Sequence, residues 1–337
     1  MGRVRKVLAT FGRRLLCYGQ CRLQRLLQSF VAGPPLWPHE AAFGPAYSQE
    51  NPGFKVLLVI AHPDDESECA AVLYRITHEL GGAVDQVIVT NGEAGTQYSA
   101  PAQAYYGLSL SEETFGPRRL ARLRRKEVLR SSQILGIRHS YFFDQRDTGF
   151  TLDPLEGFHA WNIELVRQRL FTLLERERYD LVLVLLPTAD THGHHQTVAQ
   201  ITLEAVANLG PEDRPAVLGA QTMASEAALP ESFSEREGFP LTRTTSAKPA
   251  WTFDRRTPLK CHHALDYSIV VNWVIAEHKS QGIFQMEYGR RTEEYFWLFH
   301  IGGPSGAARW RDFLQKVEDS QQSSAGREEE FAKALSA

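Results

Sequence analysis

Two short clusters of histidine and aspartate have the composition of a hydrolytic metal site. Residues 62–65 read His-Pro-Asp-Asp and closely follow an apolar run. Residues 192–195 read His-Gly-His-His and come shortly after another apolar run. Two histidines and one carboxylate are a common ligand set for catalytic zinc, which keeps a fourth position open for water. We therefore expect His62, Asp65 and His195 to bind one zinc ion per chain.

Asp64, beside this ligand set, could perform acid–base chemistry. Adjacent side chains cannot easily point the same way, so we expect one aspartate to bind the metal and the other to handle a proton. Zinc lowers the pKa of a bound water to about 7, and Asp64 would act on that water as the general base. Pro63 restricts His62 to extended conformations, which turns these side chains out of the strand.

Structural roles are the alternative for both clusters. An aspartate before a helix that starts near Glu66 often caps the helix N-terminus. A single histidine after a strand is more often a packed or capping residue than a ligand. Three histidines within four residues, together with the first cluster, favour the metal site.

Both clusters resemble the motifs of the LmbE/PIG-L family of zinc-dependent N-acetylglucosamine de-N-acetylases. The likeness extends over residues 54–281. Four further segments support it: Thr-Asn-Gly-Glu-Ala-Gly at 90–95, Arg-Arg-Lys-Glu at 124–127, Leu-Gly-Ile at 135–137 and His-Lys-Ser-Gln at 278–281. The resemblance implies a Rossmann-like fold and the removal of acetyl groups from amino sugars carried on lipids, inositol or other small aglycones.

The resemblance also implies roles for single residues. It assigns the zinc to His62, Asp65 and His195 and the role of base to Asp64. His192 would stabilise the oxyanion or donate a proton to the departing amine. The residues expected to contact the substrate are Arg124, Glu93, Asp147 and His278. By spacing alone, Arg124 could equally lie on a solvated helix face, and His278 could cap a helix.

This chain departs from the family pattern in two places. The commonest second motif has Pro-Asp between its histidines, where this chain has Gly193 and His194. The aspartate of the common motif, which would orient His192 as the acid, is then missing. Its role is either unfilled or taken by Asp190 or Asp147. Glycines that often follow the first motif are replaced by Cys-Ala-Ala at 69–71. We expect these changes to affect the substrate pocket and to leave the zinc chemistry intact.

Strands and helices alternate in the part of the chain that must position these clusters. The expected strands are 55–60, 84–90, 140–143, 179–186 and 216–223. The expected helices are 68–80, 117–135, 162–177, 195–209 and 266–284, with Gly136 as a C-cap. This pattern predicts an α/β protein with a Rossmann-like, doubly wound, mostly parallel sheet of order 3-2-1-4-5 and helices on both faces. Strands one and four then lie side by side, and their carboxyl ends form the ligand crevice.

Three segments are expected along the chain. Residues 1–53 would form a basic amphipathic leader helix and a proline-rich linker, 54–310 the deacetylase domain, and 311–337 a helix end and polar tail. Residues 1–32 contain seven basic residues and no acidic one. They lack the roughly 18 apolar residues of a spanning helix and could lie on an anionic membrane surface. A solvated leader helix and a targeting peptide are the alternatives.

Residues 98–116 and 230–260 are expected to be excursions from the α/β core that lie near the site.

Composition and motifs argue against some classes of partner and cofactor. The chain has 337 residues, 43% of them hydrophobic, and a net charge of −3, which argues against nucleic acid. Four cysteines without paired spacing indicate neither disulfides nor a cysteine zinc site, so we expect a cytoplasmic protein. Peripheral membrane contact through residues 1–32 is one of the alternatives for that segment. No G-x-G-x-x-G motif follows the first strand, which argues against a nucleotide cofactor. The alternatives to a deacetylase are a catalytically silent sugar- or lipid-binding protein and a hydrolase of another amide; the presence of Asp64 weighs against the silent protein.

Overall fold

The computed structural model describes residues 40–41, 52–223 and 232–335. The amphipathic helix expected over residues 1–32 and most of the linker lie outside these residues. Within the described part of the chain, no helix combines the length and apolar character needed to cross a membrane.

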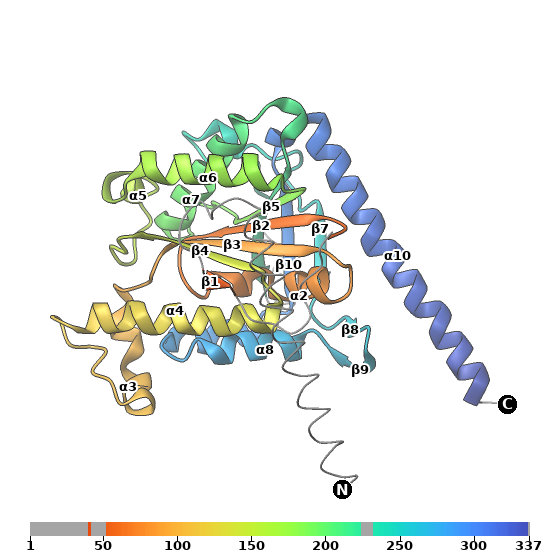
Figure 1. The fold of residues 1–337 in the computed structure, drawn as a ribbon, viewed down its shortest axis with the longest axis horizontal. Coiled ribbons are helices and arrows are strands. Elements are labelled where there is room, and N and C mark those ends of the chain that lie inside the picture. Colours follow the sequence, from red (N-terminus) through yellow and green to blue (C-terminus); the bar gives the residue numbers. More distant parts are fainter. Residues whose placement is uncertain (1–39, 42–51, 224–231, 336–337) are drawn as a thin grey trace, which may run out of the picture. The chain divides into compact units, whose positions relative to one another are not determined.

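A mixed sheet forms the centre of the fold (Figure 1), with the strand order β1-β4-β3-β2-β5-β6-β10-β7. Its strands are β1 Glu40–Ala41, β2 Lys55–Ile60, β3 Ala83–Thr90, β4 His139–Gln145, β5 Leu181–Leu185, β6 Ala216–Met223, β7 Trp251–Asp254 and β10 Glu293–Leu298. The five from β4 to β6 are parallel. This arrangement confirms the predicted order 3-2-1-4-5, and β2 and β5 are neighbours as expected.

Antiparallel strands extend the sheet beyond the predicted core. β10 pairs with β6 and β7 pairs with β10. β10 was not predicted, and the segment 230–260, expected to be an excursion, contributes β7 to the sheet. At the other edge β1 pairs with β4, so the sheet includes residues upstream of the expected domain start at residue 54. A separate two-stranded ribbon joins β8 Pro258–Leu259 to β9 His262–Asp266.

Helices cover both faces of the sheet, as predicted. Figure 1 shows α2, α4 and α8 on one face and α5, α6 and α7 on the other. The α-helices are α2 Ala70–His78, α3 Ala100–Tyr106, α4 Gly116–Leu135, α5 Glu156–Ala160, α6 Ile163–Glu177, α7 Gly193–Ala207, α8 Ser268–Glu277, α9 Gly282–Glu287 and α10 Gly303–Leu335. The 3-10 helices are η1 Asp65–Cys69, η2 Gly95–Ser99, η3 Pro211–Asp213, η4 Pro240–Thr242, η5 Tyr288–Arg290 and η6 His300–Gly302. Gly136 ends α4 with φ 68°, which confirms the predicted C-cap.

Several boundaries differ from the prediction. The helix expected at 68–80 starts with the 3-10 turn η1, because the first cluster occupies its beginning. The single helix expected at 266–284 is broken at residues 278–281, where the side chains of His278 and Gln281 bond to Glu66 and Pro63. The loop expected at 98–116 contains α3, and α10 continues through the polar stretch after Asp319.

A buried ion pair attaches the first cluster to the sheet. Arg255 Nε donates to Glu294 Oε1 at 2.9 Å, and the two side chains are 1% and 0% exposed. Glu294 also accepts hydrogen bonds from the backbone N–H groups of Ala71 and Val72, at the start of α2. Unsatisfied N–H groups at a helix start favour a carboxylate. The pair therefore fixes the beginning of α2, a few residues after the first cluster.

Candidate metal centre and active site

The carboxyl ends of β2 and β5 bring the two clusters together. These strands are parallel neighbours, so the residues that follow them meet at one edge of the sheet. His62 Nδ1 lies 3.3 Å from His195 Nε2, although the two residues are far apart in the sequence. The crevice predicted from the strand order therefore contains both histidine clusters.

Three predicted ligands face one another. Asp65 Oδ1 lies 3.1 Å from His195 Nε2, and Asp65 Oδ2 lies 3.7 Å from His62 Nδ1. Their ligand atoms all lie within 4.8 Å of one another. The side chains of His62, Asp65 and His195 are only 12%, 8% and 13% exposed. This donor set of two imidazoles and a carboxylate fits a divalent metal such as zinc.

Other groups hold the remaining atoms of these side chains. Asp65 Oδ2 accepts the backbone N–H groups of Ala61 and His62 at 3.0 and 2.8 Å. His195 Nδ1 lies 3.1 Å from Thr191 Oγ1. Hydrogen bonds from surrounding groups commonly orient the side chains that bind a metal. The arrangement therefore leaves Asp65 Oδ1 and His195 Nε2 facing the common centre.

A second group of three histidines shares one member with this set. His62, His192 and His194 also bring ligand atoms within 4.8 Å of one another. However, His194 does not line the pocket, whereas His62, Asp65 and His195 all do. A metal that acts on a substrate must face the pocket, and a carboxylate balances part of its charge. The set that contains Asp65 is therefore the better candidate to hold a metal ion.

Charge interactions link the protonation of His62 to that of Asp65. Burial disfavours a charged His62, but the hydrogen bond and negative charge of Asp65 outweigh it and raise the pKa of His62 to about 9. Burial also disfavours the Asp65 carboxylate, yet His195 and His62 hold its pKa well below its usual value. Both pKa shifts therefore favour an ion pair between His62 and Asp65.

If zinc occupies this centre, its binding should strengthen as the pH rises toward about 9. Zinc requires the neutral ring of His62, and below the pKa of about 9 a proton competes for that ring. Displacing one proton should raise the apparent affinity about tenfold per pH unit. Competition with a chelator between about pH 6 and 8, corrected for the chelator's own protonation, measures this slope. A flat profile would show that His62 does not have to lose a proton.

Asp64 lies beside the ligands in an unusual backbone conformation. Its φ of 119° is rare for a residue with a side chain. Its backbone N–H donates to Glu66 Oε2 at 3.0 Å and its carbonyl accepts from Ser67 N at 3.0 Å. It occupies the N-cap position of η1, but its side chain makes no capping hydrogen bond. The structural alternative of a helix cap therefore does not account for this carboxylate.

The environment of Asp64 suits proton transfer. Burial, followed by the charge of Asp65, raises the pKa of Asp64 to about 8, although His278 and Arg124 oppose the shift. A bound cation would lower this pKa again. A carboxyl group with a pKa nearer neutrality than usual can accept a proton and return it.

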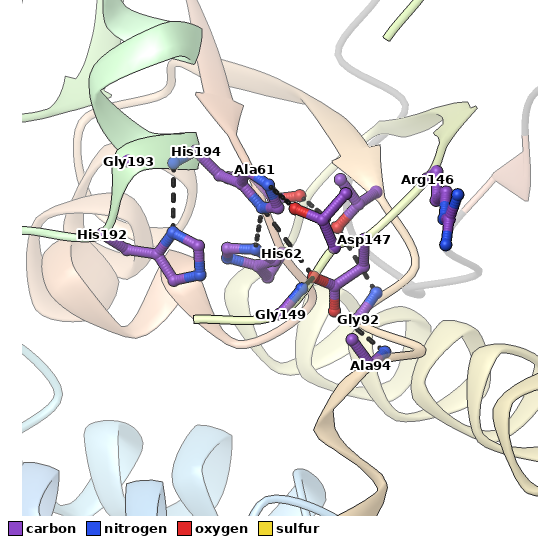
Figure 2. Close-up of polar contacts among 12 residues, drawn as sticks. Ala61, His62, Gly92, Ala94, Arg146, Asp147, Gly149, His192, Gly193 and His194 are labelled. Carbon is purple, nitrogen blue, oxygen red and sulfur yellow. Dashed lines mark hydrogen bonds and ion pairs between the residues drawn. The ribbon is translucent and has the colours of Figure 1, made fainter. Parts of the chain in front are cut away.

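His192 caps α7 and also faces the pocket. The backbone N–H of His194 donates to His192 Nδ1 at 3.0 Å, as Figure 2 shows. Burial and the neighbouring histidines lower the pKa of His192 to about 2, so its ring is neutral and carries its hydrogen on Nε2. His192 is therefore suited to donate a hydrogen bond. Of the two roles expected for it, the environment favours oxyanion stabilisation.

The departure at Gly193 has a steric cause. A Cβ atom at this position would lie 2.0 Å from the carbonyl oxygen of Asp153. The backbone N–H of Gly193 donates to Thr151 O at 2.7 Å, a bond that proline could not make. The loop at 151–153 thus requires glycine where the common motif has proline.

A pocket of about 610 Å³ opens over the centre. Its lining residues are His62, Asp64, Asp65, Ala94, Gly95, Gln97, Tyr98, Arg124, Asp147, Gly149, Phe150, Asp190, Thr191, His192, His195, Gln281 and Arg291. Of the residues expected to contact the substrate, Arg124 and Asp147 line this pocket. Glu93 and His278 lie behind its wall: Glu93 Oε1 accepts from the backbone of Asp147, and His278 Nε2 lies 2.6 Å from Glu66 Oε1.

Glycines allow Arg124 to reach the pocket. Its guanidinium donates to the carbonyl oxygens of Gly92 and Gly95 at 2.5 and 3.4 Å. A Cβ atom at either glycine would lie 2.6 Å from a guanidinium nitrogen, and Gly92 has φ 67°. The segment at 90–95 therefore forms a cradle for this arginine.

Among the pocket residues not predicted from the sequence are Tyr98, Phe150, Gln281 and Arg291. Gln281 belongs to the His-Lys-Ser-Gln segment that supported the resemblance, and its side chain donates to Pro63 O. Tyr98 starts the segment expected to form an excursion. Phe150 and Arg291 had no signal in the sequence, because contacts from distant parts of the fold bring them to the pocket.

Fold and site together define a doubly wound α/β protein with a His/Asp cluster that could hold a metal ion at the carboxyl ends of its central strands. Residues 57–206 match the family described as PIG-L: GlcNAc-PI de-N-acetylase. The match over this part of the chain confirms the resemblance to the PIG-L/LmbE family that the two motifs predicted.

Two bacterial relatives carry the description probable N-acetyl-alpha-D-glucosaminyl L-malate deacetylase 2. The protein of Bacillus anthracis is 29% identical over 160 residues, which cover 48% of this chain and 62% of the relative. The protein of Bacillus cereus is 25% identical over 178 residues, which cover 52% of this chain and 72% of the relative.

Solved structures with a similar arrangement include proteins of different activities. The N,N'-diacetylchitobiose deacetylase of Pyrococcus horikoshii is 20% identical with a TM-score of 0.47, covering 73% of this chain and 84% of its own. The 4-carboxy-2-hydroxymuconate hydratase of Pseudomonas putida is 15% identical with a TM-score of 0.49, covering 73% and 95%.

Proposed function

We propose that this protein is a zinc-dependent hydrolase that removes the acetyl group from an N-acetylated amino sugar. The observation that carries the proposal is the convergence of His62, Asp65 and His195 within 4.8 Å, beside Asp64 and in an open pocket. The family match and the names of the two Bacillus relatives support an amino-sugar amide as the substrate.

Zinc held by His62, Asp65 and His195 would supply a Lewis acid that makes water acidic near neutral pH. Asp64 accepts the proton that the attacking water loses as its oxygen bonds to the amide carbon. His192 Nε2–H donates a hydrogen bond to the carbonyl oxygen as that oxygen gains negative charge. Asp64 then returns the proton to the nitrogen as the C–N bond breaks, because an unprotonated amide nitrogen is a poor leaving group. The products are acetate and the free amine.

The pocket supports a polar substrate of moderate size. Its volume of about 610 Å³ lies in the range of small-molecule sites. Arg124 and Asp147 place a cation and an anion in its wall, both suited to sugar hydroxyl groups. Phe150 adds an aromatic ring, 72% exposed and 5.3 Å from the ring of His192, against which an apolar part of the substrate could pack.

Incubation with a panel of N-acetylglucosamine conjugates tests this function. The zinc-loaded full chain should convert at least one conjugate to its free amine, as measured by mass spectrometry, with release of one acetate per amine. Protein stripped of metal by a chelator is the control and should be inactive until zinc is restored. Zinc-loaded protein that deacetylates none of these conjugates would instead favour another amide or a silent binding protein.

A further inference from the structure

The fully buried side chain of His194 contacts His62. His194 Nδ1 lies 3.0 Å from His62 Nε2, a contact drawn in Figure 2. The other ring nitrogen, His194 Nε2, lies 3.0 Å from Thr148 Oγ1. Asp147 Oδ1 is 3.8 Å from His194 Nδ1, beyond hydrogen-bond distance. Both nitrogens of this ring are therefore within hydrogen-bond distance of a polar partner.

These distances determine where the hydrogens lie. His62 Nδ1 faces Asp65 and His195, so it is the nitrogen that must be free of hydrogen to bind a metal. The hydrogen of a neutral His62 is then on Nε2, which donates it to His194 Nδ1. His194 in turn carries its own hydrogen on Nε2 and donates it to the hydroxyl oxygen of Thr148.

We propose that His194 is a positioning residue for zinc binding, because its Nδ1 accepts the hydrogen bond that fixes the tautomer and orientation of His62. Metal-binding histidines usually donate their second N–H to a carboxylate, a carbonyl or water. Here an uncharged imidazole, itself held by Thr148, performs that task. This inference rests on the proposed zinc site.

Two substitutions separate positioning from packing. His194→Leu keeps most of the ring's volume and removes the acceptor, whereas His194→Asn loses volume and keeps an acceptor oxygen near the place of Nδ1. We expect His194→Leu to weaken zinc binding by about 10–100-fold and His194→Asn to recover most of that loss. Chelator competition on the full chain measures the zinc affinity, and circular dichroism checks the fold.

Thr148→Val provides a milder variant if the His194 variants do not fold. It leaves both rings in place and removes the acceptor of His194 Nε2–H. We expect a weaker zinc affinity, with a loss smaller than that of His194→Leu. An unchanged affinity would overturn the role of Thr148 in holding His194.

The results that would contradict the proposal can be told apart from one another. A His194→Asn variant weaker than His194→Leu would show that packing matters and would overturn the proposal. Zinc loss in both variants as complete as in His195→Ala would make His194 a direct ligand, and unchanged affinity in both would also overturn the proposal. If the unchanged protein bound no zinc, the proposed metal site itself would fail.

Discussion

Replacing Asp64 by asparagine should lower the turnover of the deacetylation by about 10²–10⁴-fold. Asparagine has nearly the same shape and also tolerates positive φ, but its amide cannot accept the proton of the attacking water. Asp64 does not belong to the three ligands, so the zinc content should remain near one per chain and KM should change little. Steady-state kinetics combined with elemental analysis measure these quantities.

Asp144→Asn is a matched control. Asp144 is also an aspartate at positive φ, 53°, but its side chain is 57% exposed and does not line the pocket. It pairs with Arg125 at the surface, where such pairs contribute little to stability. This variant should keep the turnover of the unchanged protein. Near-normal turnover in Asp64→Asn would remove Asp64 from the role of base.

His195→Ala should leave the protein almost without zinc and without activity. The substitution removes one of three protein ligands, so the affinity should fall by more than the roughly 10–100-fold expected for a residue outside the ligand shell. Elemental analysis after dialysis and chelator competition measure the loss. The exposed His300 provides the control, since His300→Ala removes an imidazole far from both clusters in the sequence.

His192→Ala distinguishes the two sets of ligands. If zinc lies among His62, Asp65 and His195, this variant should retain the metal and lose turnover, because the donor to the carbonyl oxygen is missing. If zinc instead lies among His62, His192 and His194, His192→Ala should lose the metal and His195→Ala should keep it. That second result would contradict the assignment made from the pocket.

The parallel core and the meeting of the two clusters could be predicted from the sequence. Buried parallel strands are continuous apolar runs, as in β2 and β5, and their order follows from the alternation of strands and helices. Each cluster comes shortly after one of these two runs. Neighbouring strands then bring His62 and His195 together, because carboxyl ends of adjacent parallel strands share one edge.

The remaining parts depend on contacts between distant segments. β10 has no alternation of polar and apolar residues, and its position follows from pairing with β6 and β7. The break after α8 depends on Gln281, whose side chain bonds to Pro63 O across the fold. The contact of His194 with His62 could not be predicted either, since the spacing of a motif does not define which ring nitrogen faces which partner.

The backbone of Asp64 bears on how natural selection acts at this position. A φ of 119° costs a residue with a side chain about 1–3 kcal/mol, whereas glycine adopts such angles freely. Selection for folding stability alone would therefore favour glycine at residue 64. The aspartate at this strained position therefore points to a function of its carboxylate, independently of the ligand geometry.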